Sequence, residues 1–557
     1  MRRCPYCHRW MLEDEEIEVI AKPAWGSTRG DRIEEKNDEV KAEVDPCTVS
    51  LRPRKRSKYH LPPLSLLEPG LLNQKKGDKE LSERKRLLEE TLSRFGIDGE
   101  VKKCHQGPII TTYEFFPSPG TKPSQVAELA ENLTFSFETE SVRIQRIPGK
   151  SSLGIEIPNE MRQIIRLCDI IGSDKFQVSS SKLTFALGRD VYGGVVVADL
   201  AAMPHLLIAG SSGTGKSVAL NALITSILFK ATPEEVKLIL VDTKKLEFSL
   251  YEGIPHLLCP IINDPKKAHI VLMEIVKKME ERFRLLQSAK VRNIEQYNEQ
   301  VTEFLATKKG RLNKKEKAKL RSLPYIVLIV DELADLMMFG KQEIEFFIGR
   351  LAQLARAVGI HLVMATQRPS FDVITGTIKN NFSCRIAFRV PSKVDSRIII
   401  DTGGAERLLG MGDMLFLPPN VPRPVRVHGA FISIPETRRL AKHAQSQGRP
   451  IYDARLLDIA SANDDIFSDR ETEKDELYEK AIELVLKGGQ ASASFIQRRL
   501  KLGYARAARI IDCMETEGII GASEGPKPRV VLINYRDYLK RKRRKRPTKS
   551  KARRIRK

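Results

Sequence analysis

The order of apolar and polar positions predicts alternating strands and helices over the middle of the chain. Segments with helical spacing separate the apolar runs, which favours a mainly parallel sheet covered on both faces, that is, an α/β domain over about 201–424. The five predicted strands are Leu206–Ala209, Val236–Val241, Tyr325–Val330, His361–Ala365 and Arg385–Val390.

Two further regions flank this α/β domain. From about Leu81 to Gly188, strand-like runs such as PIITTYEFFP alternate with helical patterns, which predicts an α+β domain. Beyond a polar linker at Ser461–Asp475, residues 475–535 predict three helices followed by two strands. Ala507, Ile510, Ile511 and Met514 fall on one face of the third helix and form its predicted core side. Three helices and a two-stranded wing make a winged helix.

Charge and cysteine content narrow the class of protein. The 557 residues include 94 Lys+Arg and 71 Asp+Glu, for a formal net charge of +23, and the last 18 residues hold 13 basic and no acidic side chains. This balance favours a polyanionic partner, nucleic acid first and an acidic membrane second, although a solvated tail without a partner is the alternative for the tail itself. Eight mostly scattered cysteines favour a reducing compartment. We find no apolar stretch long enough for a signal peptide or a membrane span and expect a cytoplasmic protein.

The segment HLLIAGSSGTGKSVALNALI at His205–Ile224 joins a predicted strand to a predicted helix through a glycine-rich turn. It fits G-x-x-x-x-G-K-[ST] in full, so its backbone N–H groups are expected to surround the phosphates of ATP. Lys216 would reach the β- and γ-phosphates, and Ser217 would ligate Mg²⁺. A chance glycine-rich turn is the alternative. The candidate nucleotide-binding residues are Gly210, Ser211, Ser212, Gly213, Thr214, Gly215, Lys216, Ser217 and Val218.

Two other strand ends supply candidate catalytic residues. Asp331 and Glu332 follow the strand Tyr325–Val330, where Asp331 would hold Mg²⁺ and Glu332 would polarise the attacking water. Gln367 follows the strand His361–Ala365 and would sense the γ-phosphate. Arg350 and Arg356 lie on the preceding helix, where an arginine is more often a surface ion pair than a transition-state group.

The sequence resembles the FtsK/SpoIIIE family of DNA translocases. The resemblance runs from about Gly107 to Arg529 and includes MPHLLIAGSSGTGKSVALN, MEERFRLL, IVDELADLMM, LARAVGIHLVMATQRPSFDVITGTIKNNF and GAERLLGMGDMLFLP. Upstream, GPIITTYEF and IPGKSSLGIEIPN resemble the α domain of the family, which accompanies its RecA-like motor. This chain has Leu333 where the family has Phe, and Thr243 where it usually has Pro. Neither change removes a catalytic group.

The resemblance implies an ATPase that forms rings, hexamers by expectation, and threads double-stranded DNA through its channel. It also implies that Arg356 is an arginine finger completing the site of the neighbouring subunit and that Lys393 is a sensor. Residues 475–535 resemble the γ domain, which recognises short DNA sequences. Its candidate DNA-contact residues are Arg498, Arg506, Arg509, Lys527 and Arg529. The pattern alone leaves a protein-binding winged helix open.

The N-terminal string Cys4-Pro-Tyr-Cys7-His8 has the ligand spacing of half a zinc site. Only Cys47 and His60 are available nearby to complete the set, so an unliganded reduced pair is the alternative.

These observations predict the following domains: a variable region (1–85), an α-like domain (86–188), a RecA-like P-loop motor (189–460), a winged helix (475–535) and a basic tail (536–557). The function that follows is DNA translocation in chromosome segregation at cell division, with division or recombination proteins as partners. A DNA tether that uses ATP only for assembly, and a conjugation or packaging motor, are the alternatives.

Overall fold

The computed structural model divides the chain into two compact units, 1–56 and 57–557. In the first, β1 (Arg2–Arg3) pairs antiparallel with β2 (Trp10–Met11). The described residues are 2–3, 10–11, 59–70, 78–147, 149–307, 321–419, 421–461, 477–500, 507, 510–511, 513–515, 517–521 and 529–538.

An antiparallel sheet with helices on it forms the first domain of the second unit. Its strand order is β3-β4-β6-β5, and its core includes Leu88, Tyr113 and Phe115. This confirms the predicted α+β domain. The elements are α1 (Asp78–Arg94), β3 (Gly99–Gln106), β4 (Ile110–Pro117), α2 (Pro123–Glu128), α3 (Ala130–Ser136), β5 (Arg143–Arg146) and β6 (Leu153–Pro158).

A nine-stranded sheet of order β10-β11-β12-β9-β13-β14-β15-β7-β8 forms the motor domain. The first five strands in that order are parallel, and they are the five strands predicted from the sequence, within two residues at each end. They are β9 (His205–Ala209), β10 (Val236–Val241), β11 (Tyr325–Val330), β12 (Ile360–Thr366) and β13 (Cys384–Phe388). The parallel core of the α/β fold is therefore confirmed.

Four antiparallel strands extend the sheet beyond β13 and were not predicted as part of it. They are β7 (Thr184–Asp190), β8 (Val195–Asp199), β14 (Asp413–Leu417) and β15 (Val425–Gly429). β7 pairs with β15, so the predicted boundary between residues 188 and 189 falls inside a strand of the motor sheet. The structure places this boundary earlier, because α4 (Leu167–Ile171) and α5 (Asp174–Val178) share a core with β7. Local patterning missed the pairing because the two strands lie far apart in sequence.

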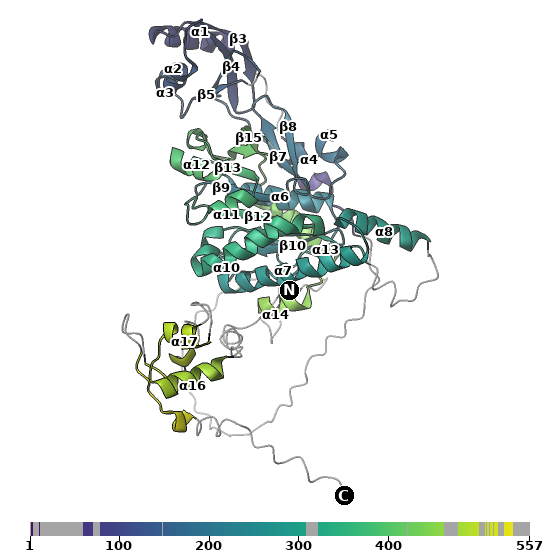
Figure 1. Cartoon of the computed structure of the whole chain (residues 1–557). Coiled ribbons are helices and arrows are strands. Elements are labelled where there is room, and N and C mark those ends of the chain that lie inside the picture. Colours follow the sequence, from purple (N-terminus) through teal and green to yellow (C-terminus); the bar gives the residue numbers. More distant parts are fainter. Residues whose placement is uncertain are drawn as a thin grey trace, which may run out of the picture. The chain divides into compact units, whose positions relative to one another are not determined.

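Helices cover both faces of the parallel strands. Successive side chains of a strand point to opposite faces of the sheet, and both sets are apolar here, so both faces must be buried. On one face, α7 (Pro265–Ser288) packs beside α10 (Leu333–Leu354) (Figure 1). On the other face lie α6 (Lys216–Lys230) and α13 (Ile434–Gln447). Within the described residues, the other helices of this domain are α8 (Ile294–Thr307), α11 (Gly376–Asn381), α12 (Lys393–Ile400) and α14 (Ala454–Ser461).

The C-terminal module contains α16 (Tyr478–Gly488) and α17 (Ala493–Leu500), and helical residues follow between 507 and 515. The predicted core face is confirmed, because Ala507, Ile510, Ile511 and Met514 are all buried in one cluster. Antiparallel bridges between Ile520 and Val531 and between Ala491 and Arg529 supply the wing pairing. In the part of the chain that is described, none of the helices combines the length and hydropathy needed to span a bilayer.

Candidate nucleotide-binding site

The glycine-rich turn between β9 and α6 has the backbone geometry that the motif predicts. Gly213 and Gly215 have φ of +75° and +118°, which side-chain-bearing residues rarely adopt. A Cβ on Gly215 would lie 2.7 Å from the Cα of Gly412, and one on Gly210 would lie 2.5 Å from the Cβ of Phe388. α6 begins at Lys216, so its unpaired N–H groups face this turn, where phosphates bind favourably.

Lys216 and Asp331 form a buried ion pair at the carboxyl edge of the parallel strands. The Nζ of Lys216 donates to Oδ1 of Asp331 at 2.5 Å and to its backbone carbonyl at 2.6 Å. Burial raises the pKa of the Asp331 carboxyl, and the lysine opposes this shift. The structure thus brings together two predicted residues that lie 115 positions apart.

Two buried carboxylate oxygens at this edge accept no hydrogen bond from the described residues, namely Oδ2 of Asp331 and Oδ1 of Asp242. The other oxygen of Asp242 accepts from the backbone N–H groups of Glu247 and Phe248, at 2.9 and 3.0 Å. Ser217, the predicted magnesium ligand, donates its hydroxyl to Oε1 of Glu247 at 2.7 Å. Unsatisfied carboxylate oxygens beside a phosphate-binding turn are the donor set that Mg²⁺ prefers, so these residues fit a Mg²⁺–nucleotide complex.

Asp242 and Glu247 are residues of the site that the sequence analysis did not assign to it. A signal existed for Asp242, because it follows the buried strand β10 just as Asp331 follows β11. The carboxyl ends of neighbouring parallel strands meet at one edge, so the two aspartates are expected to converge. Glu247 carries no such signal, since it reaches Ser217 through an irregular loop.

Glu332 is fixed beside the P-loop by several donors. Its Oε1 accepts from the hydroxyl of Thr366 at 2.6 Å, and its Oε2 accepts from the backbone N–H of Gln367 at 3.1 Å. Lys244 lies 3.6 Å from Oε2 and also donates to the side-chain carbonyl of Gln367 at 3.4 Å. The predicted base and the predicted sensor, Glu332 and Gln367, therefore share one hydrogen-bonded group.

Lys393 and Arg356 lie at opposite ends of the parallel strands, Lys393 at the carboxyl ends and Arg356 at the amino ends. Lys393 is exposed and begins α12 just beyond the carboxyl end of β13, the strand next to β9. Arg356 lies on the 3₁₀ turn η3 (Ala355–Val358), before the start of β12. The seven residues of β12 span about 23 Å, so Arg356 is too distant to touch phosphates held by its own P-loop.

Two of the other arginines named from the sequence, Arg350 and Arg529, form ion pairs with glutamates. Arg350 pairs with Glu280 at 2.5 Å on the surface, which is the ordinary surface ion pair expected of an arginine on a helix. Arg529 pairs with Glu515 on the C-terminal module, and its backbone N–H donates to the carbonyl of Ala491 at 2.9 Å. Arg498 is exposed on α17, while Arg506, Arg509 and Lys527 lie outside the described residues.

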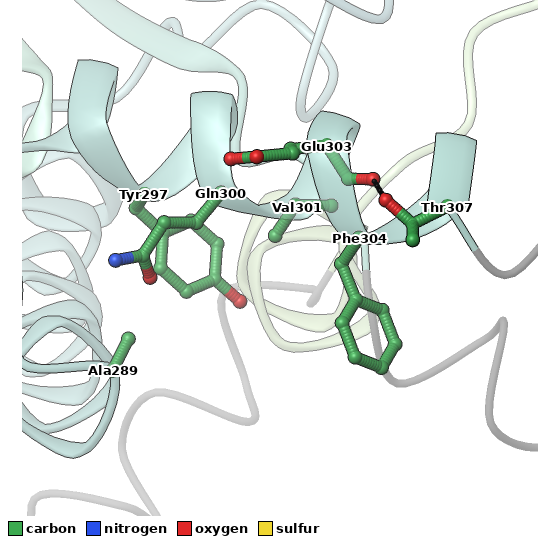
Figure 2. A pocket seen from close by; sticks show the side chains of 7 residues that line it. All are labelled: Ala289, Tyr297, Gln300, Val301, Glu303, Phe304 and Thr307. Atoms are coloured by element: carbon green, nitrogen blue, oxygen red, sulfur yellow. Dashed lines mark hydrogen bonds between the residues drawn. The ribbon is translucent and has the colours of Figure 1, made fainter.

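Two cavities lie away from the P-loop and the carboxyl ends of the parallel strands. Figure 2 shows one of about 410 Å³ beside α8, where Tyr297, Val301 and Phe304 extend from the helix. It contains none of the predicted site residues. The other, of about 570 Å³, is lined by Arg356, Leu354 and Tyr325 among others.

The predicted zinc ligands Cys4 and Cys7 lie outside the described residues, as does Cys47. Over the described ranges, no group of three or more His, Cys, Asp or Glu side chains is placed to hold a metal ion.

Asp331 is expected to make ATP binding depend on Mg²⁺. We expect Asp331→Asn to bind ATP with much less dependence on Mg²⁺, because an amide is a poor ligand and no longer holds Lys216 by charge. Titration calorimetry with and without Mg²⁺ measures this difference. A variant whose ATP affinity rises on adding Mg²⁺ by the same factor as in the wild type would contradict the assignment.

A P-loop at the end of β9, an aspartate and a glutamate at the end of β11 and a parallel sheet define this domain as a P-loop NTPase. Three family models match the chain: the FtsK alpha domain at residues 61–159, the FtsK/SpoIIIE family at 166–371 and the FtsK gamma domain at 472–534. The chain belongs to the FtsK/SpoIIIE family.

Curated relatives extend this similarity over nearly the whole chain. DNA translocase FtsK of Bacillus cereus (strain ATCC 14579) is 44% identical over 534 residues, and DNA translocase SpoIIIE of Bacillus subtilis (strain 168) is 43% identical over 536. Each alignment covers 94% of this chain and 65% of the relative, so the chain spans just under two thirds of their length.

Solved structures with a detectable likeness include the pCW3 conjugation coupling protein TcpA in its monomer form with ATPgS. It has a TM-score of 0.43 and 22% identity and covers 65% of this chain and 99% of that one. The cytoplasmic domain of the Type VII secretion ATPase EccC of Thermomonospora curvata has a TM-score of 0.40 and 22% identity, covering 47% of this chain and 31% of that one.

Proposed function

We propose that this protein is an ATP-driven motor that translocates double-stranded DNA, and that it acts in chromosome segregation at cell division. The observation that carries the proposal is the placement of Glu332, a buried carboxylate aligned by Thr366 and Gln367 beside the P-loop. A protein that used ATP only to assemble would not require an aligned base of this kind. The relatives named DNA translocase supply the substrate.

Each residue has a distinct role in the proposed reaction. Backbone N–H groups of the P-loop and the ammonium of Lys216 hold the phosphates, which requires Lys216 to leave Asp331. A magnesium ion held by Ser217 and Asp331 would neutralise phosphate charge. Glu332 accepts a hydrogen bond from the attacking water and so increases its nucleophilicity, while Gln367 and Lys393 contact the γ-phosphate.

Displacement of a triplex-forming third strand from linear duplex DNA tests the translocation itself. We expect ATP-dependent release of the third strand, with a delay that grows with its distance from the DNA end. ATP turnover stimulated by DNA without release of the third strand would favour the tether and overturn the motor. The conjugation or packaging motor is less favoured, because the C-terminal module is of the gamma type.

The assembly follows from the position of Arg356. This side chain lies at the amino ends of the parallel strands, whereas its own P-loop lies at their carboxyl ends. We therefore propose that it completes the site of a neighbouring subunit in a ring, by expectation a hexamer. Recruitment to the division site, division or recombination partners and a zinc ion at Cys4 and Cys7 remain further parts of the proposal. Metal analysis of the purified chain tests the last of these.

We propose that the C-terminal module reads DNA sequence and the basic tail does not. Loss of Arg506 or Arg509 is expected to cost about 1–3 kcal/mol on a preferred site and little elsewhere, if the side chain pairs with a guanine. Deleting Lys540–Lys557 should weaken binding to all DNA and flatten its salt dependence, because these charges meet phosphates. Salt titrations on a selected and a scrambled site measure both effects. Loss of discrimination on removing the tail would refute this division of roles.

A further inference from the structure

The buried face of α7 contains one cation among apolar side chains. The residues of that face follow helical spacing, and Arg282 lies between Met279 and Leu286 with only 5% of its surface exposed. The MEERFRLL segment that contains it has no role in the phosphate site described above. A charged side chain in an apolar stripe raises the question of what it holds.

The guanidinium of Arg282 joins two segments that lead into neighbouring strands. One nitrogen, Nη1, donates to the carbonyl of Val358 at 2.7 Å, and the other, Nη2, donates to the carbonyl of Pro324 at 2.7 Å. Val358 ends the turn η3 before β12, and Pro324 immediately precedes β11. Burial lowers the pKa of Arg282 to about 10, so the side chain stays protonated at neutral pH and keeps both donors.

Burying the Arg282 guanidinium costs free energy of desolvation, and packing of the apolar core does not require a charge at this position. Among the described residues Arg282 forms no ion pair with a carboxylate, so its charge is met by the two carbonyl dipoles. An unbranched apolar side chain of similar length would continue the stripe of α7 and avoid the desolvation penalty. The contribution of the arginine is therefore geometric: it fixes the position of η3 relative to β11.

We propose that Arg282 is the positioning residue for Arg356, which lies on η3 two residues before Val358. The turn is short and closed by Gly359, whose φ is +68° and whose N–H donates to the carbonyl of Arg356 at 3.2 Å. The position of the Arg356 backbone thus depends on this turn, and Arg282 holds the turn through the carbonyl of Val358. The inference rests on the proposed trans role of Arg356, which it deepens.

DNA-stimulated ATP turnover of Arg282→Met, compared with its affinity for ATP, tests the proposal. We expect kcat to fall between about 10-fold and 10²-fold, the cost of a catalytic group displaced by about 1 Å. ATP affinity should be unchanged, because the P-loop lies at the opposite ends of the parallel strands from η3. Arg282→Lys retains the charge but not the paired donors, so its kcat should be intermediate. Arg284→Met, the same change on the exposed face of α7, should behave as the wild type.

Mixed rings separate positioning from a general loss of structure. Arg282→Met mixed with Lys216→Ala should regain part of the activity, because some interfaces pair an intact P-loop with a correctly held Arg356. Arg282→Met mixed with Arg356→Ala should regain none, because every subunit then lacks a working arginine finger. Recovery in the second mixture would overturn the proposal.

Failure of the trans role of Arg356 and failure of the positioning role of Arg282 give different experimental results. Full activity in Arg356→Ala would refute the trans role itself. A slow Arg356→Ala protein together with wild-type kcat in Arg282→Met would refute only the positioning role. If Arg282→Met does not fold, Arg282→Lys decides the matter, since wild-type kcat in that variant would show that the paired donors are not needed.

Discussion

A Glu332→Gln protein is expected to bind ATP like the wild type and to lose almost all turnover. The amide retains the size of the side chain and can place its one oxygen where Oε1 accepts from Thr366 at 2.6 Å and from the backbone N–H of Gln367 at 3.3 Å, but it is far less basic toward water. Removing a positioned base costs on the order of 10²–10⁴-fold in rate. Binding of a labelled ATP analogue and steady-state phosphate release with duplex DNA measure the two properties separately.

The matched control is Glu436→Gln, since Glu436 is another buried glutamate whose carboxylate accepts hydrogen bonds, at the N-terminus of α13. Its change should lower the melting temperature and leave turnover per folded molecule unaltered, because it lies in a helix cap. Normal turnover in Glu332→Gln would refute the assignment of the base.

The parallel core was predictable because its strands are buried on both faces and so form continuous apolar runs. The part of the sheet formed by β14, β15, β7 and β8 was not, because β7 and β8 precede the P-loop and β7 pairs with β15, which lies far downstream. Local patterning reports which residues are apolar but not which distant strand they pair with.

The phosphate site was predictable where spacing itself carries chemistry. The P-loop fixes Lys216 and Ser217, and an acidic pair after a buried strand identifies Asp331 and Glu332. Glu247 and Arg282 were not assigned, because their roles depend on which carbonyls or hydroxyls the fold places beside them. The charged position within the apolar stripe of α7 was visible in the sequence, but its partners lie on segments that only the fold brings together.

Arg356→Ala is expected to bind ATP normally and to turn it over about 10³-fold more slowly, the scale of other arginine fingers. The reason is geometric. β12 separates Arg356 from the catalytic edge, and the exposed side chain lines a cavity of about 570 Å³ where another subunit can approach. A positive charge delivered from outside stabilises the negative charge that develops on the γ-phosphate.

Complementation between two inactive proteins gives the sharpest test of this trans role. Lys216→Ala removes the phosphate contact in its own site but keeps Arg356, and Arg356→Ala does the reverse. In mixed rings, an Arg356→Ala subunit whose neighbour is Lys216→Ala has an intact P-loop facing an intact finger, so turnover should recover in part. The recovery should be greatest near equal proportions of the two proteins, because such interfaces are then most frequent. If both proteins assemble into mixed rings and turnover stays at the level of the single variants at every ratio, Arg356 does not act between subunits.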